Sequence, residues 1–537
     1  MLFNSFIFLF AYLPVALAGF HCAGRLGRHP AAVWLIVMSL LFYGWWNPGF
    51  VVLLIVSIAF NYAVSTLVGL TSGKSRLQNA VVTLGVAANL AVLVYYKYFE
   101  ALVALVAGHG LSMTYKPSIL LPLGISFFTF TQIGYLIDIQ QGEAKDRGLL
   151  NYILFVTFFP HLIAGPILHN REIMPQFGNK TTYRFSMENL VVGLSMFVVG
   201  LCKKCVFADS FAGIVAPGFQ STGHLGLLSS WTVLLSYSLQ LYFDFSGYSD
   251  MAIGIARMFN IRFPLNFNSP HKASSIIDYW QRWHMTLTRY LTLYLFSPIA
   301  LSVTRRRLAN GRGITRKAQA TPGGFVSMVA FPTLVTMSLA GIWHGAGLQY
   351  LIFGLLHGFY LTINHAWRIF HRGDGSLRPD TGLRRCRGLM VTSLAVLIAL
   401  DFFRAPSVDA AISLLAGMVG MHGIEPLGLP AGMIGQLGGL GDYLIGHGRL
   451  ISIGPADFAS TICQLLWLAS LYGVVWFAPN SQEMITQFSP AVGRMHARPV
   501  GWPVWQPTRG WALGLGIAAT VAVLAIGGTS EFLYFKF

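Results

Sequence analysis

The stretch that decides the fold is 331-FPTLVTMSLAGIWHGAGLQYLIFGLLHGFYLTINHAW-367, in which two apolar runs are joined by a short glycine-rich turn. The full runs cover residues 324–343 and 348–368, and each has about the ~20 residues that a helix needs to cross the hydrocarbon core of a bilayer. The sequence therefore predicts a hairpin of two membrane-spanning helices. Its turn carries His344 and its second run carries His357, at depths where lipid would otherwise surround an ionisable group.

Apolar runs of similar length recur along the rest of the chain. Of the 537 residues, 55% are hydrophobic and 10% are charged, whereas roughly a quarter of the residues of a soluble domain are charged. We therefore expect an all-α integral membrane protein with a single polytopic domain over residues 1–537. It should contain roughly eleven to thirteen transmembrane helices and some re-entrant segments. The other runs lie near residues 2–20, 31–46, 50–71, 79–96, 117–138, 188–208, 224–243, 277–300, 388–403, 461–478 and 510–529.

Three segments call for separate interpretation. Residues 151–168, NYILFVTFFPHLIAGPIL, contain Pro160, Gly165 and Pro166, which predicts a broken or re-entrant helix. Residues 417–455 are rich in glycine, which predicts an irregular external loop. The first run lacks the basic residues that open a secretion signal, so we interpret it as a retained transmembrane helix.

Basic residues gather in the short loops between the apolar runs. The formal net charge is +17, but clusters such as 305–317 and 368–387 flank hydrophobic hairpins instead of forming one soluble face. Membrane lipids with anionic headgroups are therefore the expected partner, and nucleic acid is not. Because loops rich in arginine and lysine stay in the cytoplasm, both ends of the 324–368 hairpin should face that side. The five cysteines are scattered in or beside apolar runs, which argues against a disulfide framework.

Histidines are the most informative polar residues of the apolar runs. Four of them lie in or beside such runs: His161, His284, His344 and His357. Each alone has an ordinary explanation, a neutral imidazole bonded to a backbone carbonyl between packed helices. His344 differs because Trp343 and three nearby glycines, including Gly345, suit a narrow channel for an extended ligand. An imidazole there can take the proton of an acceptor hydroxyl as the hydroxyl attacks a thioester.

Two further motifs place polar groups in apolar surroundings. In 276-IIDYWQRWHMTLTRYLTLYLF-296, Trp280, Trp283 and His284 either lie on the inner rim of the same channel, where a second imidazole polarises the thioester carbonyl, or belong to a membrane-surface helix with snorkelling arginines. In 239-LQLYFDFSGYSDMAIG-254, Asp244 and Asp250 lie on different faces of a helix. With Tyr248 they are expected to form a polar network that fixes the helices around the channel. No metal site is predicted, because these groups lack a ligand spacing such as HExxH.

Seven motifs occur in order along the chain. They are LPLGISFFTFTQIGYLID (121–138), FFPHLIAGPI (158–167), QLYFDFSGYSDMAIG (240–254), DYWQRWH (278–284), GIWHGAG (341–347), FFRAPS (402–407) and FAPNSQE (477–483). Together they resemble the membrane-bound O-acyltransferase (MBOAT) family, in the branch of alginate O-acetyltransferase (AlgI-like) and the teichoic acid D-alanylation protein.

The resemblance implies a ring of helices around a thin central layer. The family core would cover about residues 115–405, and C-terminal helices with an aromatic tail would cover about residues 455–537. His344 matches the catalytic histidine of the family, and His284 matches its second signature position. The residues expected to line the substrate channel are Trp283, Trp343, Gly345, His161, Asp244, Tyr248 and His357.

The resemblance also implies an activity. The chain would be a multi-pass O-acyltransferase of the bacterial inner membrane that passes an acetyl group from a cytoplasmic thioester to an exported polysaccharide of the alginate or cellulose type. Acetyl-CoA would be the donor substrate, with no bound cofactor. The implied partners are a periplasmic SGNH-type acetyltransferase (AlgX-like or AlgJ-like) and a polysaccharide synthase complex.

Alternatives remain within and outside this class. Transfer of D-alanyl groups or acylation of peptidoglycan stays open, because no soluble domain that would select the acceptor is visible in the sequence. A transporter or channel without covalent chemistry is the alternative from another class. The inverted halves that are common in transporters are not visible in the sequence.

The last residues, 531-EFLYFKF-537, suggest a second reactive group. They resemble the C-terminal aromatic motif of acyl-relay partners in this family, in which a tyrosine accepts the acyl group. Tyr534 is thus a candidate acyl relay. The alternative is an aromatic anchor that closes the last helix at the membrane interface.

Overall fold

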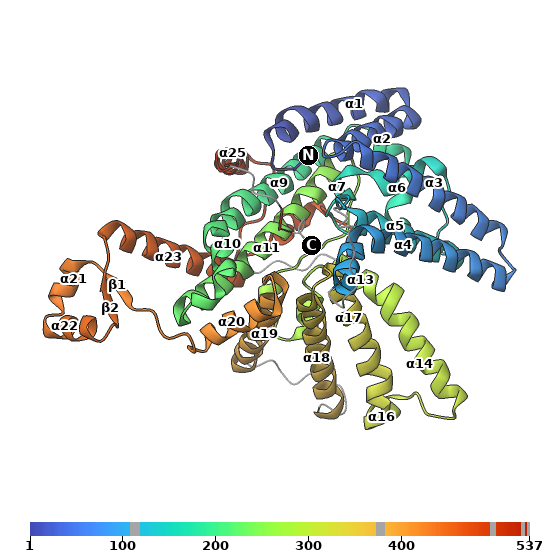
Figure 1. Ribbon diagram of the computed structural model, residues 1–537. Coiled ribbons are helices and arrows are strands. Elements are labelled where there is room, and N and C mark those ends of the chain that lie inside the picture. The colour runs from blue at the N-terminus through green and yellow to red at the C-terminus, as the bar shows by residue number, and fades with distance from the viewer. Residues whose placement is uncertain (108–118, 372–381, 494–500, 528–531, 534–537) are drawn as a thin grey trace.

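The computed structural model confirms an all-α integral membrane protein. It describes residues 1–107, 119–371, 382–493, 501–527 and 532–533 (Figure 1). Within them, seven helical segments are long and apolar enough to span a bilayer: Phe8–Leu26, Gly49–Leu70, Ser75–Ala104, Met187–Gln220, Pro322–His344, Gly382–Arg404 and Pro455–Phe477. The other predicted runs form helices that are shorter, broken or more polar.

Four N-terminal helices form one side of the molecule (blue in Figure 1). The first two are tied by side chains that donate to backbone carbonyls: Tyr12 Oη to Met38 at 2.7 Å and Trp34 Nε1 to Ala16 at 3.0 Å. Because apolar side chains face both lipid and the protein interior, these polar links help fix the pairing of the helices. The helices are α1 (Leu13–Leu26), α2 (Arg28–Gly44), α3 (Gly49–Leu70) and α4 (Ser75–Ala107).

The centre is built on α9 (Met187–Cys202), which continues into the π-helix η3 (Lys203–Ala208), packed along α11 (Leu227–Met258). The two backbones touch, since a Cβ added at Gly200 would lie 2.6 Å from the carbonyl oxygen of Gly247. Two ion pairs join the same elements. Lys204 Nζ lies 2.6 Å from Asp244 Oδ1, and Lys203 Nζ lies 2.6 Å from Asp250 Oδ2.

These ion pairs match the polar network predicted for the 239–254 motif. Asp244 and Asp250 lie on different faces of α11, as predicted, and each pairs with a different one of the two adjacent lysines on η3. The third carboxylate, Asp209, lies 2.9 Å from Lys204 Nζ. Buried charges of this kind are retained where each has an opposite charge within hydrogen-bond distance.

Broken helices occur where proline and histidine interrupt the apolar pattern. The predicted break within 151–168 is present: α6 (Leu149–Thr157) ends, Phe158 leaves the helical conformation with ψ of 107°, and α7 (Phe159–Leu162) is a single turn. The run at 277–300 is also divided. Its short helix α12 (Ile276–Trp280) is followed by His284 with φ of 42°, and only then by α13 (Met285–Leu291).

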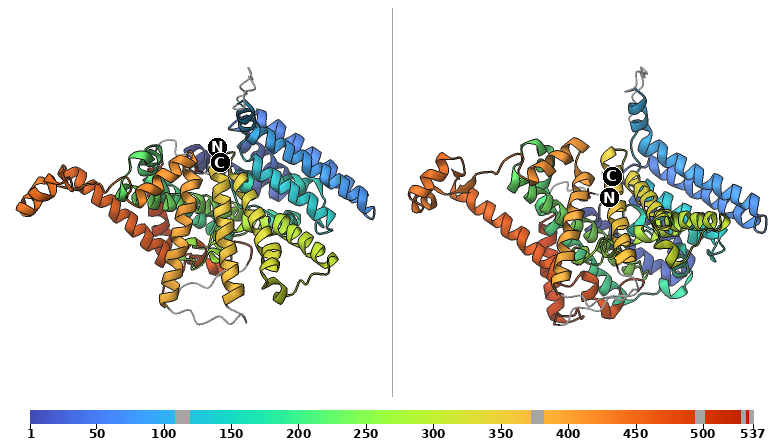
Figure 2. Two further views of the ribbon diagram at one scale, coloured as in Figure 1. Left: turned by 60° about the horizontal axis from the view of Figure 1, so that its bottom comes forward. Right: turned by 90° about the horizontal axis from the view of Figure 1, so that it is seen from below.

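The 324–368 hairpin forms as predicted. Its helices are α17 (Phe331–His344) and α18 (Leu348–His371), and α18 packs in turn on α19 (Gly382–Arg404), so that the three run side by side (Figure 2). The remaining helices of the main body are α5 (Ile125–Gln140), α8 (Asn170–Gly178), α10 (Ala212–Gln220), α14 (Ser297–Ala309), α15 (Arg316–Gln319), α16 (Pro322–Phe325) and α20 (Val408–Met418).

The prediction of an irregular loop over 417–455 is wrong. This segment contains two short helices, α21 (Ala431–Gln436) and α22 (Gly439–Gly446), and a parallel pair of strands, β1 (Leu427–Leu429) and β2 (Leu450–Ser452). Glycine is a signal for loops in a sequence, but helices as short as α21 and α22 also tolerate it at their ends. The small unit projects from one side of the molecule (Figure 1).

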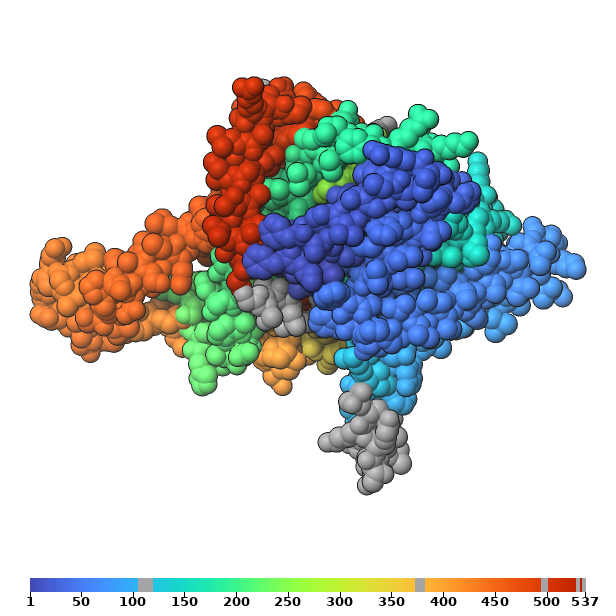
Figure 3. Space-filling model, turned by 90° about the horizontal axis from the view of Figure 1, so that it is seen from above, coloured from blue at the N-terminus to red at the C-terminus, as the bar shows by residue number. Residues whose placement is uncertain are grey.

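The C-terminal part returns to the main body. Helix α23 (Pro455–Phe477) leads back from the small unit, α24 (Ser481–Met484) follows, and α25 (Arg509–Leu524) packs against α9. The view from above shows this segment (red) beside the first helices (dark blue) (Figure 3). Phe532, near the end of the sequence, is buried in the interior.

Candidate active site

Three histidines meet at one small cavity inside the helix bundle. The cavity has a volume of about 20 Å³, close to that of a single water molecule. We call it the histidine cavity, and its lining is Leu241, Tyr279, Trp280, Trp283, His284, Leu287, His344, Phe353, His357, Leu400 and Phe403. Histidines from three different helical segments, far apart in sequence, thus share one space.

The α17–α18 hairpin positions two of these histidines by close contact between glycines. A Cβ added at Gly354 would lie 2.3 Å from the carbonyl oxygen of Met337, and one at Gly341 would lie 2.3 Å from that of Tyr350. Only residues without a side chain allow the two backbones to approach this closely. The hairpin therefore fixes His344 at the end of α17 relative to His357 on α18.

His344 is held between aromatic rings at the C-terminus of α17. Its ring lies 4.9 Å from that of Phe403 and 5.8 Å from that of Phe353, both edge to face, and 6% of the residue is exposed. The carbonyls before it are capped from α4: Lys97 Nζ donates to Trp343 O and Tyr98 Oη donates to Ile342 O at 2.7 Å. A cation at a helix C-terminus is favourable, so Lys97 stabilises the end of the helix that presents His344.

His284 has a defined tautomer. Its Nδ1 lies 2.9 Å from Asn266 Oδ1, and the same amide oxygen accepts from Thr286 Oγ1 at 2.8 Å. Because an amide oxygen only accepts, Nδ1 of His284 carries the hydrogen and the lone pair of the neutral ring lies on Nε2. Neutral His284 therefore presents an acceptor on Nε2.

His357 has the opposite tautomer. Trp280 Nε1–H, which can only donate, lies 3.2 Å from its Nδ1. Nδ1 is thus the acceptor, and Nε2 of the neutral ring carries the hydrogen. The ring also stacks parallel to that of Tyr279 at 6.2 Å, which holds its orientation. The histidine cavity thereby combines one imidazole whose Nε2 is an acceptor, that of His284, with one whose Nε2–H is a donor, that of His357.

The residues predicted to line a channel separate into two groups. Trp283, His284, His344 and His357 line the histidine cavity. Trp343 lies behind His344, stacked on Phe130 at 5.3 Å, and Gly345 abuts the ring of Tyr350, so neither belongs to the lining.

The remaining predicted channel residues lie elsewhere. His161 is bonded through Nε2 to the carbonyl of Phe155 at 2.9 Å, which is the ordinary explanation considered from the sequence. Asp244 holds Lys204 and accepts from the backbone N–H of Leu533 at 3.0 Å, and Tyr248 stacks on Phe532 at 4.6 Å. Tyr534 itself lies outside the described residues.

Two positioning residues, Lys97 and Asn266, were missed from the sequence. Lys97 could have been found, since a lysine at the end of an apolar run indicates a partner within the membrane. Asn266 acts only through the tautomer of His284, and no spacing in the sequence connects this pair, which is 18 residues apart. Trp280 was placed on the rim of the channel from the sequence and does line the histidine cavity, but its bond to His357, 77 residues away, was not predicted.

A larger cavity adjoins this site. It has a volume of about 420 Å³ and shares Tyr279, Trp283 and Leu400 with the histidine cavity. The three imidazoles are therefore separated from a substantial space by two aromatic side chains and a leucine.

A polytopic membrane protein with three imidazoles around one buried cavity is equipped to move protons within the bilayer, as a group-transfer enzyme requires. Comparison with known sequences identifies the class more narrowly. The chain belongs to the membrane-bound O-acyltransferase family: the model of that family matches residues 125–311, and relatives more than 30% identical cover most of the chain. It is thus an O-acyltransferase, as the resemblance of its motifs predicted.

Individual relatives carry several related activities in their names. A peptidoglycan O-acetyltransferase of Helicobacter pylori is 36% identical over 79% of this chain and 81% of its own. A probable alginate O-acetylase, AlgI, of Pseudomonas putida is 31% identical over the whole of both chains. A teichoic acid D-alanyltransferase of Streptococcus thermophilus is 26% identical over 52% of this chain and 68% of its own.

Proposed function

We propose that this protein passes an acetyl group from a cytoplasmic acetyl-CoA across the bacterial inner membrane for O-acetylation of an exported polysaccharide of the alginate type, with cellulose as the other candidate polymer. The observation that carries the proposal is the histidine cavity, where His344 meets two further imidazoles inside the membrane domain. The choice of acetyl as the group rests on relatives whose names state O-acetyl transfer.

The proposed step is a direct acyl transfer. The acceptor hydroxyl attacks the thioester carbonyl carbon, forming a C–O bond while the C–S bond breaks. His344 takes the hydroxyl proton and delivers it to the leaving thiolate, so that an ester and a free thiol result. The wall of aromatic rings around His344 keeps water from competing as the acceptor.

The tautomers suggest which imidazole faces the developing oxyanion. From the sequence, His284 was expected to polarise the thioester carbonyl, but its neutral ring presents a lone pair on Nε2. Since Trp280 leaves the hydrogen of neutral His357 on Nε2, we assign the donor role to His357. His284 then serves as an acceptor that helps orient the attacking hydroxyl.

The burial of Phe532, two residues before Tyr534 in the sequence, supports a role for Tyr534 as an acyl relay. Phe532 is 2% exposed and packs 5.7 Å from Phe245, whose ring lies 4.8 Å from that of His284. An anchor at the membrane interface would not place Phe532 in the interior. In this proposal, Tyr534 receives the acetyl group, and a periplasmic SGNH-type enzyme collects it for the polysaccharide synthase complex.

The test is the acetyl ester content of the polymers made by a producing strain. His344→Ala should abolish ester on the exopolysaccharide at normal protein level, while His365→Ala, on α18 and outside the histidine cavity, should leave it unchanged. Measuring acetyl ester on peptidoglycan in the same strains tests whether peptidoglycan is the acceptor instead, an alternative favoured by the 36% identical peptidoglycan O-acetyltransferase. Normal exopolysaccharide ester in the His344→Ala strain would overturn the proposal.

A further inference from the structure

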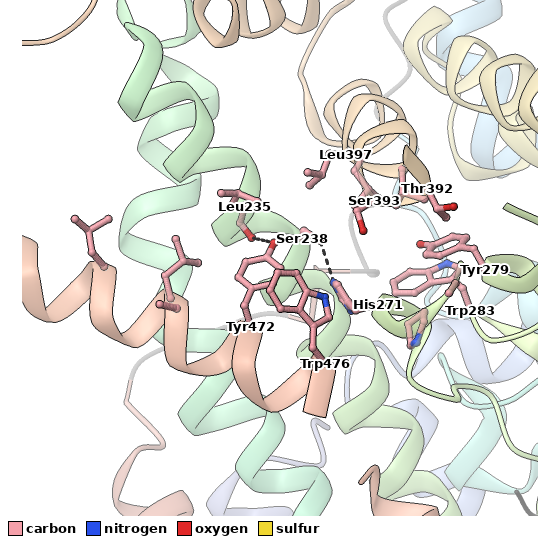
Figure 4. Close-up of a pocket in the computed structure, with 17 residues that line it drawn as sticks. Leu235, Ser238, His271, Tyr279, Trp283, Thr392, Ser393, Leu397, Tyr472 and Trp476 are labelled. Carbon is pink, nitrogen blue, oxygen red and sulfur yellow. Dashed lines mark hydrogen bonds between the residues drawn. The ribbon is translucent and has the colours of Figure 1, made fainter. Parts of the chain in front are cut away.

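The larger cavity lies between three membrane-embedded helices. Its walls come from α11, α19 and α23 and from residues 270–283, which include the 3-10 helix η6 (Pro270–Lys272) and α12 (Figure 4). We call it the outer cavity. Leucine and valine side chains and the rings of Tyr472, Trp476, Tyr279 and Trp283 make up most of the wall, and none of its lining residues is an aspartate, glutamate, lysine or arginine.

The outer cavity lies between helices that are expected to be embedded in the bilayer. Helices α19 and α23 are both among the segments able to span a membrane, and only 17% of the apolar window of α23 is buried inside the protein. Two polar side chains in the wall have local partners: Ser238 Oγ lies 3.2 Å from His271 Nε2, and Tyr472 Oη donates to the carbonyl of Leu235 at 3.2 Å. A space of about 420 Å³ with such walls suits a hydrocarbon chain.

One end of the outer cavity is basic. Arg385 is exposed and lies seven residues before Thr392, a lining residue, so it occupies the same face of α19 two turns away, roughly 10 Å along the axis. Lys272 stands between the lining residues His271 and Ala273. Arg385 belongs to the basic cluster that the sequence places at 368–387, a cluster predicted to face the cytoplasm.

The charges near this end leave an excess of positive charge. Lys272 donates to the carbonyl of Ala478 at 2.7 Å, which places its ammonium at the end of α23. Burial lowers the pKa of Lys272, whereas the nearby carboxylate of Glu483 raises it. Arg282 and Arg385 lower the pKa further, as expected where several cations lie close together. Two carboxylates, Asp278 and Glu483, face these three cations, and Asp278 already pairs with Arg282 at 2.7 Å.

We propose that the outer cavity binds an anionic phospholipid, with one acyl chain between α11, α19 and α23 and the phosphate against Arg385 and Lys272. A basic site between transmembrane helices on the cytoplasmic side recognises an anionic headgroup, and the apolar wall recognises the chain. Trp476, in the last turn of α23, lies at the level where indole rings meet headgroups. The lipid would pack against Tyr279 and Trp283, and so support one wall of the histidine cavity.

Native mass spectrometry of the full-length protein in detergent, titrated with phosphatidylglycerol or phosphatidylcholine, tests the proposal. One phosphatidylglycerol should bind in preference to phosphatidylcholine. Ser393→Phe, which fills the cavity, should abolish this preference, whereas Ser470→Phe, on α23 and outside the lining, should not. Arg385→Gln should weaken binding about fivefold, and Arg384→Gln, turned to another face of α19, should leave it unchanged.

Two results would overturn the proposal. One is equal binding of both lipids with no effect of Ser393→Phe. The other is displacement of the lipid by coenzyme A with the same dependence on Arg385, which would assign the outer cavity to the thioester donor. Acetyl transfer is measured separately, so a failure here leaves the proposed function standing.

Discussion

Replacing Gly354 with alanine should inactivate the protein without unfolding it. The new Cβ would lie 2.3 Å from the carbonyl oxygen of Met337 and 2.9 Å from Gly341 Cα, whereas ordinary contact begins at 3.4 Å. To lengthen the Cβ–O distance from 2.3 Å to the 3.4 Å of ordinary contact, α17 and α18 must separate by about 1 Å. Since His344 lies on one helix and His357 on the other, the spacing of the two imidazoles changes by a similar distance.

The magnitude follows from this displacement. Overpacking of a close contact costs about 1–3 kcal/mol of stability, which a protein of this size should tolerate. A misplacement of ~1 Å in a catalytic arrangement lowers the rate by about 10²-fold. The predicted effect is therefore a large loss of kcat with a small loss of stability.

Acetyl ester formation by purified variants, normalised to the folded fraction, measures kcat, and a thermal melt of the same variants measures stability. Two control variants with weaker steric conflicts are measured in the same way. A Cβ at Gly358 would meet the flexible side chain of Leu334 at 3.1 Å, so Gly358→Ala should lose less activity, and Gly473, with open space around it, should accept alanine without loss. Equal activities of all three variants would refute the claim that the glycine contact positions the histidines.

Three further predictions concern other parts of the structure. His357→Phe keeps a ring beside Tyr279 but removes Nε2–H, so kcat should fall about 10²–10³-fold with little change in KM; an unchanged kcat would exclude His357 as the donor. Lys203→Met leaves the Asp250 carboxylate, 12% exposed, without its cation and should lower stability by about 3 kcal/mol in thermal unfolding, with recovery in the Lys203→Met/Asp250→Leu double variant. Burial favours the neutral acid of Glu425, but hydrogen bonds from its own backbone N–H, from the Ser229 side chain and from the backbone N–H groups of Leu228 at 2.9 Å and Ser229 at 3.1 Å outweigh burial and lower the pKa of Glu425 below 4.5. Protection of the Leu228 and Ser229 amides against hydrogen exchange should therefore persist above pH 4.5 and be lost as the pH falls through the lowered pKa of Glu425. Glu425→Gln cannot titrate, so wild-type protection that is as independent of pH as in this variant would contradict the prediction.

The sequence predicted the parts of the fold that follow from hydrophobicity and backbone chemistry. The 324–368 hairpin, the break within 151–168 and the polar network of Asp244 and Asp250 all depend on local residue types. The 417–455 segment was mispredicted because glycine at the ends of short helices gives the same signal as glycine in a loop.

The candidate site was predictable only in part. A histidine in an apolar run is conspicuous, so His284, His344 and His357 were all singled out, but so was His161, which is bonded to a backbone carbonyl. What distinguishes them is tertiary structure, because a cavity forms only where three segments meet. The tautomers of His284 and His357 depend on Asn266 and Trp280, which are partners across space.

The most direct test of the central role of His344 uses purified protein in liposomes with radiolabelled acetyl-CoA, the periplasmic SGNH-type partner and an acceptor oligosaccharide. The wild type should release free CoA and transfer the label, and His344→Ala, equally folded, should lose at least about 10²-fold of both. Release of CoA and transfer of label at the wild-type rate by His344→Ala would contradict the account.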